Sequence, residues 1–156
     1  MDEEKALKFI RIEKEILSNR INFPKQNEIL MLNAVSKGNP KEKFIIDINR
    51  KRAILSRCSF QQRAYITIPL IRLDIDNKPH KNPDEKVIEG NHIHIYKEGF
   101  NLAWAYPLND PFIKQINPNF DTMLFKKLAS HGITFINFCK FCNITKIPAF
   151  QINDML

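Results

Sequence analysis

The segment Phe44-Ile-Ile-Asp-Ile-Asn49 decides the fold, because apolar side chains stand at every second position. Successive side chains of a β-strand point to opposite faces of its sheet, so Phe44, Ile46 and Ile48 would share one buried face. Similar strand-like runs, separated by turn-forming residues, lie at 29–35, 54–60, 65–74 and 91–97. Together these runs predict a central antiparallel sheet of four to six strands.

Helical patterns flank this central region. From about Glu3 to Ile21 apolar residues recur at helical spacing, which predicts one amphipathic helix. Nearer the C-terminus, Asp121 is placed to cap a helix that ends at His131-Gly132, and Thr134 is placed to cap a second helix. The expected fold class is therefore α+β, with an N-terminal helix, the antiparallel sheet and a C-terminal helical hairpin in a single domain of residues 1–156.

The composition sets limits on the class of protein. The chain of 156 residues is 44% hydrophobic with 12 Phe, which is enough for one folded core. No apolar run approaches the roughly 20 residues of a membrane-spanning helix, and the acidic start Met1-Asp-Glu-Glu-Lys5 lacks the pattern of a secretory signal. Three cysteines, an odd number, fit a reducing compartment, so we expect a cytoplasmic protein. We interpret Cys139 and Cys142 as buried structural residues.

Basic residues outnumber acidic ones, with 24 Lys and Arg against 17 Asp and Glu and a formal charge of +7. Such a surplus favours polyanionic partners, above all RNA or another nucleic acid. Arginines gather between positions 50 and 72, and arginine makes bidentate contacts with phosphate that lysine does not make. Arg50 and Arg63 are therefore candidate substrate-binding residues. The alternative interpretation is a lysine-rich surface that only keeps the protein in solution.

The most informative side chains belong to the segment His92-Ile-His-Ile-Tyr96. In a strand, His92, His94 and Tyr96 would share one face, and the isoleucines between them would face the core. Imidazole is readily poised for proton transfer near neutral pH, so one ring could act as base and the other as acid, with a nearby cation stabilising the charge on a phosphate. This combination fits metal-independent cleavage of RNA. The predicted catalytic residues are His92, His94, Arg72 and Tyr96, and the predicted substrate-binding residues are His80, Lys97, Arg63 and Arg50.

Two other interpretations of the histidines stay open. His92 and His94 together with His80 or Asp74 would give nitrogen and oxygen ligands for a metal ion. The spacing does not fix a third ligand, so no metal and no cofactor is predicted. Alternatively, the two histidines pair with cross-strand acids such as Asp47 or Asp74 and simply cover a sheet face. Alternation also places Arg72 beside Asp74, either as a local ion pair or as an arginine that its aspartate aims at a phosphate.

Five segments of the chain carry a resemblance to a known family. They are Phe44-Ile-Ile-Asp-Ile-Asn-Arg50, Gln61-Gln-Arg63, Arg72-Leu-Asp-Ile-Asp76, Pro79-His-Lys-Asn-Pro-Asp84 and His92-Ile-His-Ile-Tyr-Lys-Glu-Gly99. Residues 44 to 106 resemble a family of short bacterial proteins that is classed only as a domain of unknown function and is scattered among mobile elements and defence regions. The resemblance implies no activity, but that context favours toxin–antitoxin nucleases and phage-encoded inhibitors over metabolic enzymes.

These observations lead to one prediction of function and two alternatives. The leading prediction is a small, basic, nucleic-acid-acting protein, namely a metal-independent ribonuclease of toxin-like type, which an antitoxin would accompany. The first alternative is a non-enzymatic binding protein, such as a mobile-element or phage-encoded inhibitor of a host nucleic-acid machine. The second alternative is a metal-dependent hydrolase. No membrane partner is expected, and the sequence does not set the oligomeric state.

Overall fold

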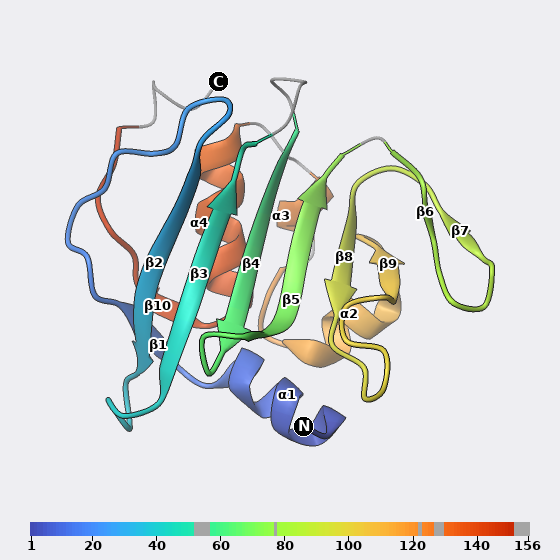
Figure 1. Cartoon of the computed structure of the whole chain (residues 1–156), viewed down its shortest axis with the longest axis horizontal. Helices are drawn as coiled ribbons and strands as arrows, with labels where there is room; N and C mark the ends of the chain where they lie inside the picture. Colours follow the sequence, from blue (N-terminus) through green and yellow to red (C-terminus); the bar gives the residue numbers. More distant parts are fainter. Residues whose placement is uncertain (52–56, 77, 122, 127–129, 152–156) are drawn as a thin grey trace.

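The computed structural model describes residues 1–51, 57–76, 78–121, 123–126 and 130–151. Within these residues the main element is an eight-stranded sheet with the strand order β10-β1-β2-β3-β4-β5-β8-β9 (Figure 1). Neighbouring strands pair antiparallel, except that β1 and β10 run parallel. The strands are β1 (Lys14–Ile16), β2 (Ile29–Ser36), β3 (Lys43–Asn49), β4 (Cys58–Ala64), β5 (Ile68–Ile75), β8 (His92–Ile95), β9 (Ala105–Pro107) and β10 (Ile144–Lys146). A separate hairpin consists of β6 (His80–Lys81) and β7 (Val87–Ile88).

The helices cover one face of the sheet, and the hydrophobic core lies between them and the strands. They are α1 (Glu3–Arg11), α2 (Pro111–Ile116), α3 (Met123–Lys126) and α4 (His131–Phe141). In Figure 1, α2, α3 and α4 lie behind the sheet and α1 lies along its lower end. Phe60 of β4 points into this core and contacts the rings of Phe135 and Phe138 on α4. Alternate strand residues point to the other face, which we call the open face because no helix of the described residues covers it.

The predicted α+β class is confirmed, with an N-terminal helix, an antiparallel-dominated sheet and C-terminal helices. The sheet has more strands than the four to six predicted, because β1, β9 and β10 have only three residues each and show no readable alternation. The predicted strand 54–60 corresponds to β4, although residues 52–56 lie outside the described part. None of the helices in the described residues is long and apolar enough to cross a bilayer.

The N-terminal helix is much shorter than predicted, because Lys14 ends it. Helix α1 stops at Arg11, and Lys14 begins β1 between β2 and β10. The buried ammonium group of Lys14 turns back and donates hydrogen bonds of 2.7, 2.8 and 2.8 Å to the carbonyls of Phe9, Ile10 and Ile12. Carbonyls at the end of a helix have no further helical N–H group to pair with, so the lysine satisfies them. The chain beyond Arg11 therefore continues as a strand.

The C-terminal helices also differ from the prediction at their ends. Asp121 does cap a helix, since its carboxylate accepts from the N–H of Met123 at 3.0 Å, although residues 127–129 of the predicted helix lie outside the described part. His131 was expected to end a helix but instead begins α4, whose N-cap is Ser130. The predicted cap, Thr134, lies inside α4 and donates its hydroxyl to the Ser130 carbonyl at 2.8 Å. Ser130 therefore caps a helix that begins at His131, where the sequence predicted that a helix would end.

Candidate functional site

Strands β5 and β8 bring four polar side chains together on the open face. Their antiparallel register sets Arg72 opposite His94 and Asp74 opposite His92. Residues directly opposite each other in a sheet point to the same side, so all four side chains share one face. The intervening Ile93 and its partner on β5 are fully buried on the core side. The prediction that the two histidines face away from the core is therefore confirmed for β8.

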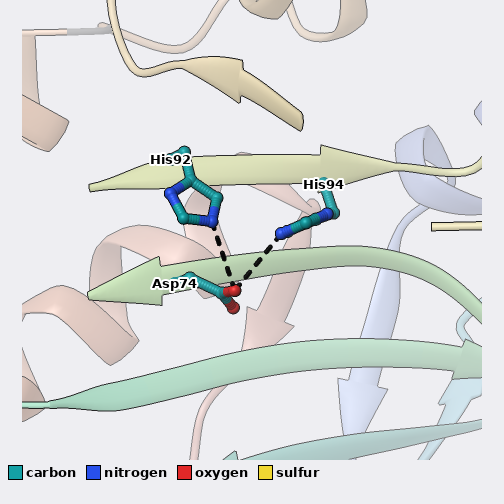
Figure 2. A group of neighbouring side chains, drawn as sticks. All are labelled: Asp74, His92 and His94. Carbon is teal, nitrogen blue, oxygen red and sulfur yellow. Dashed lines mark ion pairs between the residues drawn. The ribbon is translucent and has the colours of Figure 1, made fainter. Parts of the chain in front are cut away.

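The two imidazoles converge on a single carboxylate oxygen (Figure 2). The Nε2 atoms of His92 and His94 lie 3.4 and 3.3 Å from Oδ2 of Asp74. At the other side of each ring, Nδ1 of His92 lies 2.8 Å from the Gly90 carbonyl, and Nδ1 of His94 lies 2.7 Å from the Leu102 carbonyl. A carbonyl oxygen only accepts hydrogen bonds, so both Nδ1 atoms carry the proton. In the neutral rings, both Nε2 lone pairs therefore face Asp74.

Arg72 fixes the orientation of the Asp74 carboxylate. Its Nε donates to Oδ1 at 2.7 Å, and its Nη2 donates to Oδ2 at 3.0 Å. This is the local ion pair that alternation within β5 indicated. The Arg72 side chain remains 33% exposed and that of Asp74 14% exposed, so the guanidinium group lies between the buried centre and the solvent.

The charges of this centre shift the pKa values of its members in different directions. Burial disfavours the charged form of His92, but the Asp74 carboxylate and the Gly90 carbonyl outweigh burial and raise its pKa. Burial prevails for His94, and together with the nearby Arg72 charge it lowers the pKa of that ring despite Asp74. Burial also opposes the charge of Asp74, but the two histidines and Arg72 hold its pKa well below the usual range. Near neutral pH, the carboxylate is ionised and His94 is uncharged.

Both imidazoles are buried, with residue exposures of 3% for His92 and 2% for His94. The ring of His80, from the β6–β7 hairpin, lies against them with centroid distances of 4.6 Å to His94 and 5.8 Å to His92. The structure thus brings the predicted residue His80 to the site. A phosphate group reaches the two Nε2 atoms only after covering residues move.

The structure places the other predicted site residues elsewhere. Tyr96 follows the last residue of β8, packs in the hydrophobic core and donates its hydroxyl to the Met1 carbonyl at 2.6 Å, so it lies apart from the imidazoles. The Lys97 ammonium lies 4.7 Å from the ring centroid of Trp104. Arg63 holds Asp47 through Nε and Nη2 at 2.7 and 2.8 Å.

Arg50, the remaining predicted substrate-binding residue, is buried. Its Nη1 donates to the Pro24 carbonyl at 3.0 Å. Two of the clustered arginines, Arg50 and Arg63, are thus engaged within the fold, because their planar guanidinium groups satisfy carbonyl and carboxylate oxygens there. The clustering of arginines predicted contacts with phosphate, but the guanidinium groups of Arg50 and Arg63 bind oxygens of the protein itself.

Sequence reasoning missed one residue of the site. The amide group of buried Asn82 bridges the hairpin to the main sheet, donating to the Ala105 carbonyl at 3.0 Å and accepting from the Ala105 N–H at 2.8 Å. In the sequence, Asn82 stands in a Pro- and Asn-containing turn segment. That context is typical of surface loops, so nothing in the local pattern distinguished this asparagine.

Asp74, His92 and His94 form a group that could hold a metal ion. One potential ligand atom from each residue lies within 4.8 Å of the other two. In a tetrahedral zinc site with bonds of about 2.0–2.1 Å, neighbouring ligand atoms lie about 3.3–3.4 Å apart, which matches both nitrogen-to-oxygen distances. Two imidazoles and one carboxylate suit Zn²⁺ and Fe²⁺. The carbonyls at both Nδ1 atoms and the guanidinium at Asp74 orient the ligands as the outer shell of metal sites does.

Comparison with known proteins gives a family but no activity. Residues 1–144 match the model of a family of unknown function, DUF6978. The chain belongs to this family. The predicted resemblance to an uncharacterised family is thus confirmed, and it extends well beyond residues 44 to 106. No curated protein and no solved structure matches the chain.

Proposed function

We propose that this protein binds a divalent transition-metal ion through Asp74, His92 and His94 and uses it to hydrolyse phosphodiesters of nucleic acid. The observation that carries this proposal is the convergence of two Nε2 atoms on one carboxylate oxygen while both Nδ1 atoms are tied to carbonyls. Of the three functions compatible with the sequence, a metal-dependent hydrolase best accounts for this geometry.

A cation explains the spacing better than a proton does. Charge-assisted hydrogen bonds between nitrogen and a carboxylate are about 2.7–2.9 Å long, whereas the two distances here are 3.4 and 3.3 Å. Within the described residues, the buried Nε2 of His94 has no hydrogen-bond partner. An uncharged His94 directs this lone pair at an ionised carboxylate, which is unfavourable in a buried setting. A metal ion between the three atoms would accept both lone pairs and neutralise the carboxylate.

The number of protein ligands also favours a catalytic metal ion over a purely structural one. Three protein ligands leave a coordination position for water or substrate, as in catalytic zinc sites. When bound, the ion would lower the pKa of a coordinated water and polarise a phosphoryl oxygen. Arg72, which is partly exposed beside Asp74, would attract the phosphate. The net charge of +7 favours a polyanionic substrate such as RNA.

A metal-independent ribonuclease is the second candidate, because the pKa values of the two histidines shift in opposite directions. His92, with the raised pKa, would serve as the acid that protonates the leaving oxygen. His94, with the lowered pKa, would serve as the base that removes the 2′-hydroxyl proton. This candidate uses the same two rings but requires them to lose contact with Asp74 during the reaction.

Metal analysis combined with an RNA-cleavage assay tests both candidates. We expect one equivalent of zinc or iron to remain bound after dialysis, and His92→Ala and His94→Ala to reduce metal affinity by at least about a hundredfold. The control is His131→Ala, which removes an imidazole from α4 on the opposite side of the sheet. Cleavage of single-stranded RNA that survives EDTA in the absence of bound metal favours the metal-independent ribonuclease. Metal binding without any turnover contradicts the hydrolase.

A further inference from the structure

The β6–β7 hairpin stands apart from the main sheet, and its first residue lies against the buried centre. In Figure 1 it projects beyond the β8–β9 end of the sheet, and its two strands pair only with each other in the described residues. Its first residue, His80, contacts the rings of both His92 and His94. The hairpin therefore supplies part of the cover that keeps the two Nε2 atoms from the solvent.

Side-chain hydrogen bonds, rather than a strand ladder, attach this hairpin to β9 and the residues before it. The Asn82 amide exchanges two hydrogen bonds with the backbone of Ala105, in the way that a paired strand residue would. His80 adds a third contact, since its Nε2 lies 2.8 Å from the Ala103 carbonyl. An amide side chain that makes the two hydrogen bonds of one paired strand residue gives a specific but local attachment.

The packing around this attachment is loose. A hollow of about 310 Å³ lies between the hairpin and β9, and Val87, Ile88, Trp104 and Tyr106 are among the residues that line it. Of the two residues of β7, Val87 is 51% exposed and Ile88 is buried. An element with little buried apolar surface opens at a lower free-energy cost than the core strands do. The hairpin can thus separate from β9 while the eight-stranded sheet stays intact.

Gly90 connects the hairpin to the site. It lies two residues after the end of β7, with a φ of +74°, a conformation that glycine adopts without strain. Its carbonyl also lies 2.8 Å from Nδ1 of His92. A change in the backbone at Gly90 would therefore move the hairpin and alter the contact that orients His92. Element-terminal positions of this kind commonly serve as hinges.

We infer that the β6–β7 hairpin is a lid over the Asp74–His92–His94 centre, that Asn82 is its latch, and that opening at Gly90 admits the phosphodiester. The inference rests on the proposed function for its substrate, but the motion itself is independent of any bound metal. Opening withdraws the His80 ring from the two imidazoles and leaves Asp74 and Arg72 in place on β5.

Chemical modification of the histidines tests the lid directly. The metal-free protein is treated with diethylpyrocarbonate, and the modification of each histidine is followed by mass spectrometry. We expect slow modification of His92 and His94 in the wild type and a rise on the order of ten- to thirtyfold in Asn82→Ala, the factor expected when two hydrogen bonds of a closed state are lost. The matched control is Asn39→Ala, which removes an exposed asparagine whose Oδ1 accepts from the Lys41 N–H. Equal rates in folded Asn82→Ala and wild type would overturn the lid.

A measurement on the wild type covers the case in which Asn82→Ala does not fold. The Ala105 amide, which donates to Oδ1 of Asn82, should exchange with solvent deuterium at least about tenfold faster than the amides within the β5–β8 ladder. Equal protection of both sets would contradict local opening. Absence of metal binding in the wild type would refute the proposed function, whereas both of these assays would still decide the lid.

Discussion

Replacing Asp74 by Asn removes the charge at the centre of the site and leaves the volume of the side chain nearly unchanged. In the metal-free protein, Arg72 loses one of its two hydrogen bonds, and the other then goes to a neutral amide oxygen instead of a carboxylate. A hydrogen bond to a charged group is worth about 1.5–3 kcal/mol when fully buried. Because a third of the Arg72 side chain is exposed to water, we expect the free energy of unfolding to fall by a total of about 2–3 kcal/mol near pH 6.

The pH dependence of this loss tests the assignment of charges. Asp74 raises the pKa of His92, so the stabilisation from this pair is complete below about pH 6.5, the ordinary histidine value, and is lost as the pH rises through the raised pKa of the folded state. The lowered pKa of Asp74 gives stability that is present above about pH 3.9 and is lost as the pH falls below it. The difference between wild type and Asp74→Asn should therefore be largest between about pH 4 and 6.5 and smaller at pH 8–9.

Urea unfolding with EDTA at several pH values between 4 and 9 measures this difference. The matched control is Asp47→Asn, because Arg63 holds Asp47 through the same two nitrogens on the same face of the sheet. Asp47 has no ion pair with a histidine among the described residues. The control should lower stability by an amount that does not change from pH 5 to pH 9. A loss for Asp74→Asn that is equally constant over this range would refute the reasoning.

Three further predictions follow from individual contacts. Metal affinity should rise as the pH increases up to the raised pKa of His92, because the ion must displace the imidazole proton. Calorimetric titrations that show no rise in affinity between about pH 6 and 8 would contradict this. Lys14→Met should lower the free energy of unfolding by about 2–4 kcal/mol, because three carbonyls lose the Lys14 donor and, among the described residues, only that of Phe9 keeps another, the Gln62 amide. A change below about 1 kcal/mol in urea unfolding would count against the capping role. Ile66→Asn should raise the free energy of unfolding by about 0.5–1 kcal/mol and with it the melting temperature, because exposed Ile66 has a φ of +68° that asparagine tolerates better. A lower melting temperature would show that the turn is not strained.

Part of the site could be predicted from the sequence because strand alternation has a fixed period. The alternation of His92 and His94 with Ile93 and Ile95 placed the imidazoles on the face away from the core, and the structure confirms it. The same argument failed one residue later, because β8 ends at Ile95 and alternation no longer governs Tyr96.

Other features depend on contacts between distant segments, which no local pattern encodes. The register of β5 against β8 selects Asp74, rather than Asp47, as the carboxylate between the histidines. The end of α1 depends on the way the long Lys14 side chain turns back, although its position fits the helical stripe. The cover over the imidazoles depends on the attachment of Asn82 to Ala105, 23 residues away.

X-ray absorption at the metal edge of the zinc-loaded protein tests the central claim most directly. We predict two imidazole nitrogens and at least one oxygen at about 2.0–2.1 Å, with no sulfur scatterer. In His94→Ala, any metal that remains bound should have one imidazole ligand fewer. A shell with sulfur at about 2.3 Å would place the ion at the buried Cys139 and Cys142 instead, and a shell without imidazole would contradict the site.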